Sequence, residues 1–145
     1  MKKLGIIVLC ALLSVSMLVL PSCGRKEELP NEVGAYVVEI VSCRKTTSLV
    51  SSAVVIKYKF TNNSTIEKSF ATAIKDSVYQ DGVKLSHDLL VQVENGKNNA
   101  IKPGATVVVE VAYSLENNGR TIEVEVKERA LLFGSKKVIT RTFTI

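Results

Sequence analysis

From Ala35 to the C-terminus, apolar and polar residues alternate in short stretches, which is the period of a β-strand with one buried face. The clearest stretch runs from Ala53 to Asn62. There Tyr58 and Phe60 are expected to point inward, and Lys57 and Lys59 outward. Turn-forming residues separate the stretches, as in Asp81-Gly82, Pro103-Gly104 and Asn117-Asn118-Gly119.

This spacing predicts an all-β domain made of about seven short strands. We expect them at residues 35–44, 53–62, 70–80, 83–85, 106–115, 121–127 and 138–145, with a further short edge strand at Leu89–Val93. Short, half-buried strands of this kind favour an immunoglobulin-like antiparallel β-sandwich. Because the chain has no Trp, and no cysteine pair is expected in the domain, we predict a core held by aliphatic packing alone.

The first residues have the order of a secretory signal peptide. Met1-Lys2-Lys3 is positively charged, and the uncharged, mainly apolar stretch from Leu4 to Leu20 follows. An uncleaved membrane anchor is the alternative, but a spanning helix needs about 20 apolar residues, which puts this stretch at the lower edge. We therefore predict a signal peptide over residues 1–22.

The end of this segment carries a second signal. Leu20-Pro21-Ser22-Cys23 resembles the bacterial lipobox, although Pro21 departs from the usual residue at its position. The resemblance implies that Cys23 receives a diacylglycerol and becomes the first residue of a lipoprotein (a palmitate-type anchor) on the extracytoplasmic face of the cell membrane. Residues 24–34 would be a flexible charged tether, so that 23–34 form anchor and tether and 35–145 the sandwich domain.

Of the three cysteines, Cys10 is removed with the signal peptide and Cys23 carries the lipid, so Cys43 has no disulfide partner. The neighbouring Arg44 and Lys45 would lower a thiol pKa and make Cys43 reactive. The interpretation we favour is a small, half-buried apolar residue near the end of a strand.

The charge balance gives no sign of nucleic-acid binding. The chain has 19 Lys and Arg against 14 Asp and Glu, and loss of Lys2 and Lys3 leaves 17 against 14, or +3. With one histidine, a metal site is not expected. The carboxylates of Asp76, Asp81 and Asp88 are spread over a strand, a turn and a loop, which does not suit calcium.

No catalytic constellation is expected either, and no cofactor. His87 lies between Ser86 and Asp88, but adjacent residues on an extended chain point to opposite faces, so we interpret it as a solvated loop histidine. Three glutamates have the parity of a solvated strand face, namely Glu110, Glu123 and Glu125. The chain is therefore predicted not to be an enzyme.

Several segments together resemble the DUF5067 family, which consists of immunoglobulin-like domains of unknown function in lipoproteins, chiefly of Firmicutes, and is related to DUF4352. The segments are Val55-Ile56-Lys57-Tyr58-Lys59-Phe60-Thr61-Asn62-Asn63-Ser64, Val78-Tyr79-Gln80-Asp81-Gly82-Val83, Ile101-Lys102-Pro103-Gly104 and Val111-Ala112-Tyr113-Ser114-Leu115. The resemblance covers about Ala35 to Glu128. It implies a fold and a location, and no activity.

These observations favour a non-catalytic binding or accessory domain, whose partner would be a protein or a component of the cell envelope. The long polar connection from His87 to Ala100 is the best candidate surface, because long loops on rigid sandwiches often carry recognition. Weaker candidates are the Lys57/Lys59 face, for anionic lipid or wall polymer, and the turn residues Asn62, Asn98 and Asn117. The alternative is a structural or stress-protective envelope lipoprotein without a specific ligand.

Overall fold

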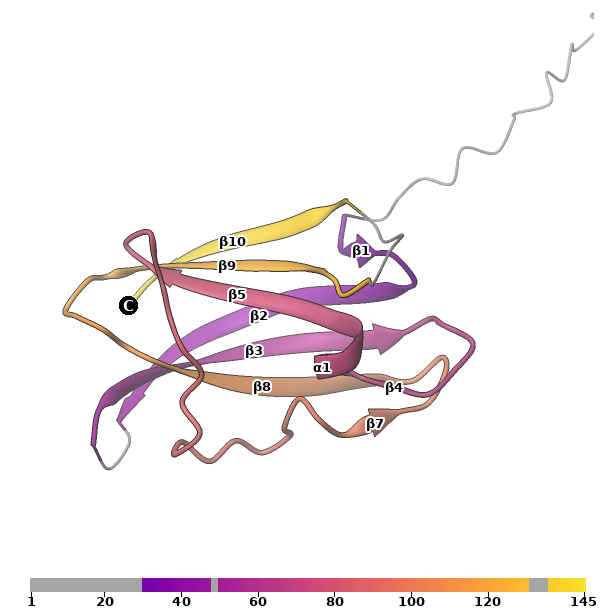
Figure 1. Ribbon diagram of the computed structural model, residues 1–145, viewed down its shortest axis with the longest axis horizontal. Helices are drawn as coiled ribbons and strands as arrows, with labels where there is room; N and C mark the ends of the chain where they lie inside the picture. Colours follow the sequence, from indigo (N-terminus) through magenta and orange to yellow (C-terminus); the bar gives the residue numbers. More distant parts are fainter. Residues whose placement is uncertain (1–29, 48–49, 131–135) are drawn as a thin grey trace, which may run out of the picture.

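The structure is a computed structural model, and it describes residues 30–47, 50–130 and 136–145. Two antiparallel sheets pack face to face (Figure 1). The first has the order β1 (Glu32–Val33), β2 (Tyr36–Thr47), β3 (Ser52–Asn62), β8 (Thr106–Ser114). The second has the order β10 (Val138–Thr144), β9 (Thr121–Glu128), β5 (Ile74–Gln80), β6 (Val83–Lys84). The predicted all-β antiparallel sandwich is thus confirmed.

A small third sheet and one helical turn close one end of the sandwich. The third sheet pairs β4 (Lys68–Ser69) with β7 (Ala100–Ile101). The chain then forms α1 (Phe70–Ala73), where a single strand from Phe70 to Gln80 was predicted. The Ser69 hydroxyl accepts the Thr72 N–H and the Thr72 hydroxyl accepts the Ser69 N–H, so a reciprocal cap stabilises this turn.

The core lies between the two sheets and follows the predicted alternation. Ile40, Tyr58 and Val109 are level with one another across β2, β3 and β8, and each is buried. Each such side chain contributes about 1.5–3 kcal/mol by leaving water. The core is not purely aliphatic, since Tyr58 and Phe70 lie 4.9 Å apart and Phe60 and Phe70 5.6 Å apart, centroid to centroid. That part of the prediction was wrong, because a turn outside the strands supplies the central ring.

The folded domain begins inside the predicted tether. Glu32 and Val33 form β1 against Val37 and Tyr36, and Val33 is fully buried. Gly34 has a φ of 63° and lies against the Glu128 side chain, so that a Cβ there would lie 2.2 Å from Glu128 Cδ. The start of the domain is therefore packed against the end of β9, where glycine is needed for both conformation and space.

The side of the sandwich between β2 and β10 is closed by an arginine and a β-bulge. The β2–β3 register shifts between Ile40 and Ser42, which leaves Val41 as an extra residue. Arg141 of β10 donates from Nη1 to the carbonyl of Ile40 and, at 3.3 Å, to that of Val41. Its guanidinium also lies 4.9 Å from the centre of the Phe143 ring. One side chain of the second sheet thus satisfies the backbone that the bulge freed in the first.

Candidate functional site

The long connection from His87 to Ala100, which was predicted as a binding surface, covers the outer edge of β8. After Lys84 the chain crosses from the second sheet to the first and runs beside β8 (Figure 1). Ser114 N–H donates to the Ser86 carbonyl at 2.9 Å, and Asp88 N–H donates to the Ala112 carbonyl at 2.9 Å. Further along, Glu110 N–H donates to the Asn95 carbonyl at 2.9 Å. The loop is therefore attached to β8 at both ends, and it uses edge groups that would otherwise be unpaired.

Asp88 fixes the first turn of this loop. Its Oδ1 accepts the Leu90 N–H at 2.9 Å, and its Oδ2 accepts the Ser51 hydroxyl at 3.4 Å. This Asx turn takes the chain off the ladder, so the short strand predicted at Leu89–Val93 is absent from this described segment. Asp88 is 8% exposed, and its carboxylate makes hydrogen bonds to Leu90 and Ser51 and none to His87. It therefore does not orient the imidazole as a catalytic triad would require.

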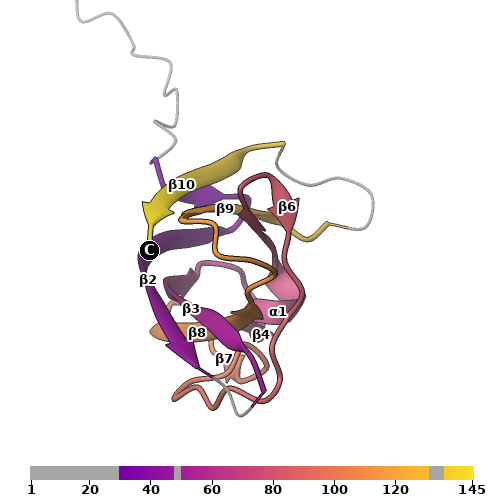
Figure 2. The same cartoon turned by 90° about the vertical axis from the view of Figure 1, so that its left-hand side faces the viewer.

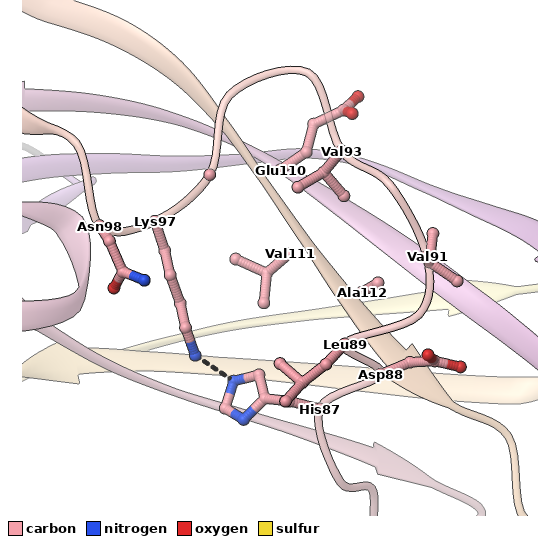
Figure 3. Close-up of a pocket in the computed structure, with 11 residues that line it drawn as sticks. His87, Asp88, Leu89, Val91, Val93, Lys97, Asn98, Glu110, Val111 and Ala112 are labelled. Atoms are coloured by element: carbon pink, nitrogen blue, oxygen red, sulfur yellow. Dashed lines mark hydrogen bonds between the residues drawn. The ribbon is translucent and has the colours of Figure 1, made fainter.

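A groove lies between the loop and β8, with a volume of about 190 Å³ (Figure 3). Apolar side chains from both sides line its length, namely Leu89, Val91 and Val93 from the loop and Val111 and Ala112 from β8. Lys97 and His87 meet at one side of the groove, and Asp88, Asn98 and Glu110 also line it. An apolar trench with a few polar groups at its rim is the usual form of a ligand or peptide site.

His87 is more ordered than the solvated histidine that was predicted. Its side chain is exposed, but its ring stacks on Tyr113 with centroids 4.8 Å apart, and Lys97 Nζ lies 2.8 Å from its Nε2. Partial burial and the nearby Lys97 lower the pKa of His87 below its usual 6.5. The imidazole is therefore neutral at pH 7, and Nε2 accepts a hydrogen bond from the lysine.

Next to His87, a second cluster of polar side chains lies between the two sheets. The Tyr113 hydroxyl donates to the Asp76 carboxylate, which joins β8 to β5. Burial and this carboxylate raise the pKa of Tyr113, so its hydroxyl stays protonated as a donor. The Tyr58 hydroxyl is buried nearby and has no hydrogen-bond partner among the described residues, and burial likewise raises its pKa.

The other two aspartates considered for calcium lie elsewhere, as expected. Asp81 sits in the β5–β6 turn with a φ of 47° and accepts the Thr121 N–H at 3.3 Å, and Asp88 serves the loop. Within the residues that the structure describes, no three His, Cys, Asp or Glu side chains gather as a metal site requires. Each aspartate has a local structural partner instead.

Glu110 differs from its prediction. It has the outward parity expected on β8, but only 5% of its surface is exposed, because the loop covers it. Lys57 Nζ lies 3.4 Å and Arg44 Nη2 3.6 Å from its carboxylate oxygens. Lys57 is therefore engaged in an ion pair with a buried acid, and the predicted Lys57/Lys59 lipid-facing surface reduces to Lys59. Glu123 is exposed, and half-buried Glu125 accepts the Tyr79 hydroxyl at 3.5 Å.

The predicted turn asparagines divide by burial. Asn62 is fully buried, and its Nδ2 donates to the carbonyls of Ile66 and Ile101. Asn117 accepts the Gly119 N–H at 2.6 Å and has a turn role. Asn98 is exposed, as Asn117 is, and of the three asparagines it is the one that lines the groove. Sequence reasoning missed Gln80, which is fully buried and donates to the carbonyls of Asn117 and Gly119 at 2.9 Å, thereby holding the β8–β9 turn.

Cys43 is half-buried and packs against the core, as the favoured interpretation of this residue predicted. Burial raises its pKa to about 11, so Arg44 and Lys45 do not activate the thiol. Cys23 and the whole predicted signal peptide lie outside the described residues. In the part of the chain that the structure describes, no helix has the length and apolarity needed to cross a membrane.

The fold and the loop-covered β8 edge define a β-sandwich domain without an assigned activity. The chain belongs to the DUF5067 family, described as a domain of unknown function, whose model matches residues 23–128. This confirms the resemblance seen in the sequence. No curated protein matches the chain.

Among solved structures, the crystal structure of YcdA from Bacillus subtilis, described as a candidate lipoprotein, has a similar fold. The TM-score is 0.59 at 13% sequence identity, over 81% of this chain and 39% of the YcdA chain. This chain thus spans about two-fifths of the length of that protein. At this identity the match shows the fold.

Proposed function

We propose that the chain is a lipoprotein anchored through Cys23 to the extracytoplasmic face of the cell membrane, and that its sandwich is a non-catalytic binding domain for an envelope protein. The lipobox-like Leu20–Cys23 segment supports the anchor. The fold likeness to YcdA, described as a candidate lipoprotein, agrees with it. Two acyl chains give stable anchoring, since each buried CH₂ contributes about 0.8 kcal/mol.

The observation that carries the binding role is the rigid display of two leucines. Leu89 is 89% exposed and Leu90 60% exposed, on a loop whose backbone is bonded to β8 on both sides of them. Neither leucine is part of the buried core. Because an ordered loop gains nothing by holding two large apolar side chains in water, a partner that covers them is the physical explanation.

The leucines also lie far from the point where the chain enters the domain. Asp88 is bonded to Ser51, beside the start of β3, whereas β1 pairs with the other end of β2. The twelve residues of β2 separate these ends by about 35 Å, at 3.3 Å per residue. The two leucines are thus presented away from the point where the chain enters the domain.

The rim indicates the chemistry of the partner. The Lys97 ammonium lies beside the neutral imidazole of His87 at one side of the groove. The two carboxylates that line the groove already have partners, Glu110 in Lys57 and Arg44 and Asp88 in Ser51. An apolar segment with an acidic residue beside it would fill the trench and pair with Lys97. We therefore expect an extended protein segment of this composition to occupy the groove.

The binding role is tested with a double substitution, Leu89→Ser with Leu90→Ser, in the lipidated protein recovered from its own membranes. The matched control is Ile66→Ser with Val83→Ser, because those side chains are 57% and 54% exposed away from the groove. We expect one stoichiometric partner to be cross-linked to the native and control proteins and lost from the leucine variant. Loss of the partner from both variants, or from neither, would contradict the groove as the binding site. Absence of any stoichiometric partner favours a structural role.

The anchor is tested separately with Cys23→Ala. This variant should incorporate no labelled fatty acid and should not be cut before residue 23, as intact-mass measurement would show. A variant that still carries lipid would place the anchor elsewhere.

A further inference from the structure

Two lysines face each other on the outer side of the second sheet. Lys75 of β5 is directly opposite Lys127 of β9, and both are exposed. Like charges directly opposite each other destabilise a sheet. Neither lysine has a carboxylate within ion-pair distance among the described residues. An anion bound between them would remove this cost.

The lysines belong to a larger concave surface, which we call the basic cleft. One hollow of about 570 Å³ is lined by Lys75, Lys127, Arg129 and Lys136, and an adjoining one of about 450 Å³ by Lys75, Lys84, Arg129 and His87. Lys75 and Arg129 belong to both hollows, so the cleft is continuous. Several cations around a hollow suit an anion with phosphate oxygens, which lysine meets as a point charge and arginine as a fork.

Two carboxylates also line the cleft, and both already have partners. Asp76 accepts the Tyr113 hydroxyl, and Glu128 interacts within the chain. Arg129 Nε donates to the Ile74 carbonyl at 3.4 Å, which holds the guanidinium at the cleft. The remaining cations of the cleft, Lys75, Lys84, Lys127 and Lys136, have no ion pair in the described part of the chain. The net charge of the cleft is therefore positive.

The larger hollow of the cleft lies at the end of the domain where the chain enters it, and the smaller one extends to His87 beside the loop groove. Gly34, just after β1, is packed against Glu128 of β9, which itself lines the cleft. Figure 1 shows β1 beside the end of β9 and the start of β10, and Figure 2 gives the view along the sandwich from its other end. From Cys23 to Pro30 an extended chain reaches about 25 Å. An anchor at Cys23 thus keeps this end of the domain close to the lipid headgroups.

We propose that the basic cleft binds the phosphate headgroups of anionic lipids in the membrane to which the chain is anchored. This rests on the proposed anchor at Cys23. Lipid is favoured over a soluble phosphate polymer because of the position of the cleft beside the tether. Binding would orient the domain, since the anchor alone leaves its rotation free.

The test uses the whole chain from residue 23 onward with Cys23→Ser, so that no acyl chain contributes to membrane affinity. Its sedimentation is measured with vesicles of about one-third phosphatidylglycerol in phosphatidylcholine and with phosphatidylcholine alone. We expect binding to the anionic vesicles only, weakening as salt rises from about 0.05 M to 0.5 M. Lys75→Gln with Lys127→Gln should weaken it about tenfold. The same variant should melt no lower than the parent, because repulsion between the lysines is removed.

The matched control is Lys45→Gln with Lys59→Gln, which makes the same change of net charge at two exposed lysines of the first sheet. Equal weakening by both pairs would show a net-charge effect and overturn the site. Absence of binding to anionic vesicles would overturn the proposal while leaving the Cys23 anchor untouched. Binding of poly(glycerol phosphate) in place of vesicles, lost in the Lys75/Lys127 variant, would keep the anion site and overturn the lipid source.

Discussion

The two lateral sides of the sandwich are each closed by one charged side chain, but in different ways. On the β2–β10 side, Arg141 donates to the carbonyls of a bulge and remains exposed. On the β8–β5 side, Asp76 accepts from the Tyr113 hydroxyl, beside a second buried tyrosine. On the first side, the exposed end of a long side chain donates to backbone carbonyls. The second is sealed by side chains, and the loop, the groove and one hollow of the basic cleft surround it.

The largest expected effect separates the two tyrosines of the β8–β5 side. Tyr113→Phe removes the donor to Asp76 and leaves a half-buried carboxylate without it, so the free energy of unfolding should fall by about 1–3 kcal/mol. Tyr58→Phe removes a hydroxyl that has no hydrogen-bond partner among the described residues. It should therefore change the free energy of unfolding by less than about 1 kcal/mol. Urea unfolding followed by circular dichroism measures both. Equal losses would mean that Asp76 does not close this side.

A smaller effect is expected on the β2–β10 side. Arg141→Ala should lower the free energy of unfolding by about 1 kcal/mol, because the hydrogen bonds to the bulge are lost but the site is open to water. Hydrogen exchange should quicken in β10 before it does in β9. Arg120→Ala serves as the control, since it is the same change at another exposed arginine. Unchanged exchange in β10 would show that the bulge does not depend on Arg141.

The smallest effect concerns His87, on the rim of the β8–β5 side. Its pKa is lowered in the folded chain, so the unfolded chain binds more protons near pH 6. Stability should therefore rise with pH through about 6.5 and decrease on acidification, when the imidazole must charge beside Lys97. The chain has one histidine, so its ring proton resonance reports the midpoint directly. Lys97→Gln should move this midpoint upward, and a midpoint at or above 6.5 in the parent would contradict the contact.

The sequence predicted the strands on both sides better than the contacts that close them. Alternation located β3, β8, β9 and β10 to within a residue or two of their bounds, because each strand carries its own period. It also gave the parity of Glu110 correctly. The burial of Glu110 could not be predicted, because the covering loop precedes β8 and its path depends on tertiary hydrogen bonds. The contact between Tyr113 and Asp76 depends on how two sheets pack, which no local pattern reports.

Of two smaller features, one has a weak local signal in the sequence and the other has none. Ser69 and Thr72 have the spacing of a reciprocal cap, and they begin the helical turn that replaced the start of a predicted strand. The bulge at Val41 had none, since Val37, Val38, Ile40 and Val41 offer two registers of similar hydrophobicity. There the choice is made by Arg141, which lies a hundred residues away from Val41 in the chain.

The bulge has a consequence for neighbouring copies of the protein. Beyond its pairing with β1, the outer edge of β2 faces no other strand in the described part of the chain, and an open edge invites a second molecule to extend the sheet. The extra residue at Val41 breaks the straight run of edge groups, and the guanidinium occupies two of the carbonyls that a foreign strand would need. Molecules held in two dimensions by the proposed Cys23 anchor would meet at this edge far more often than in solution. We therefore expect Arg141 to hinder edge-to-edge association between copies as well as to stabilise the fold.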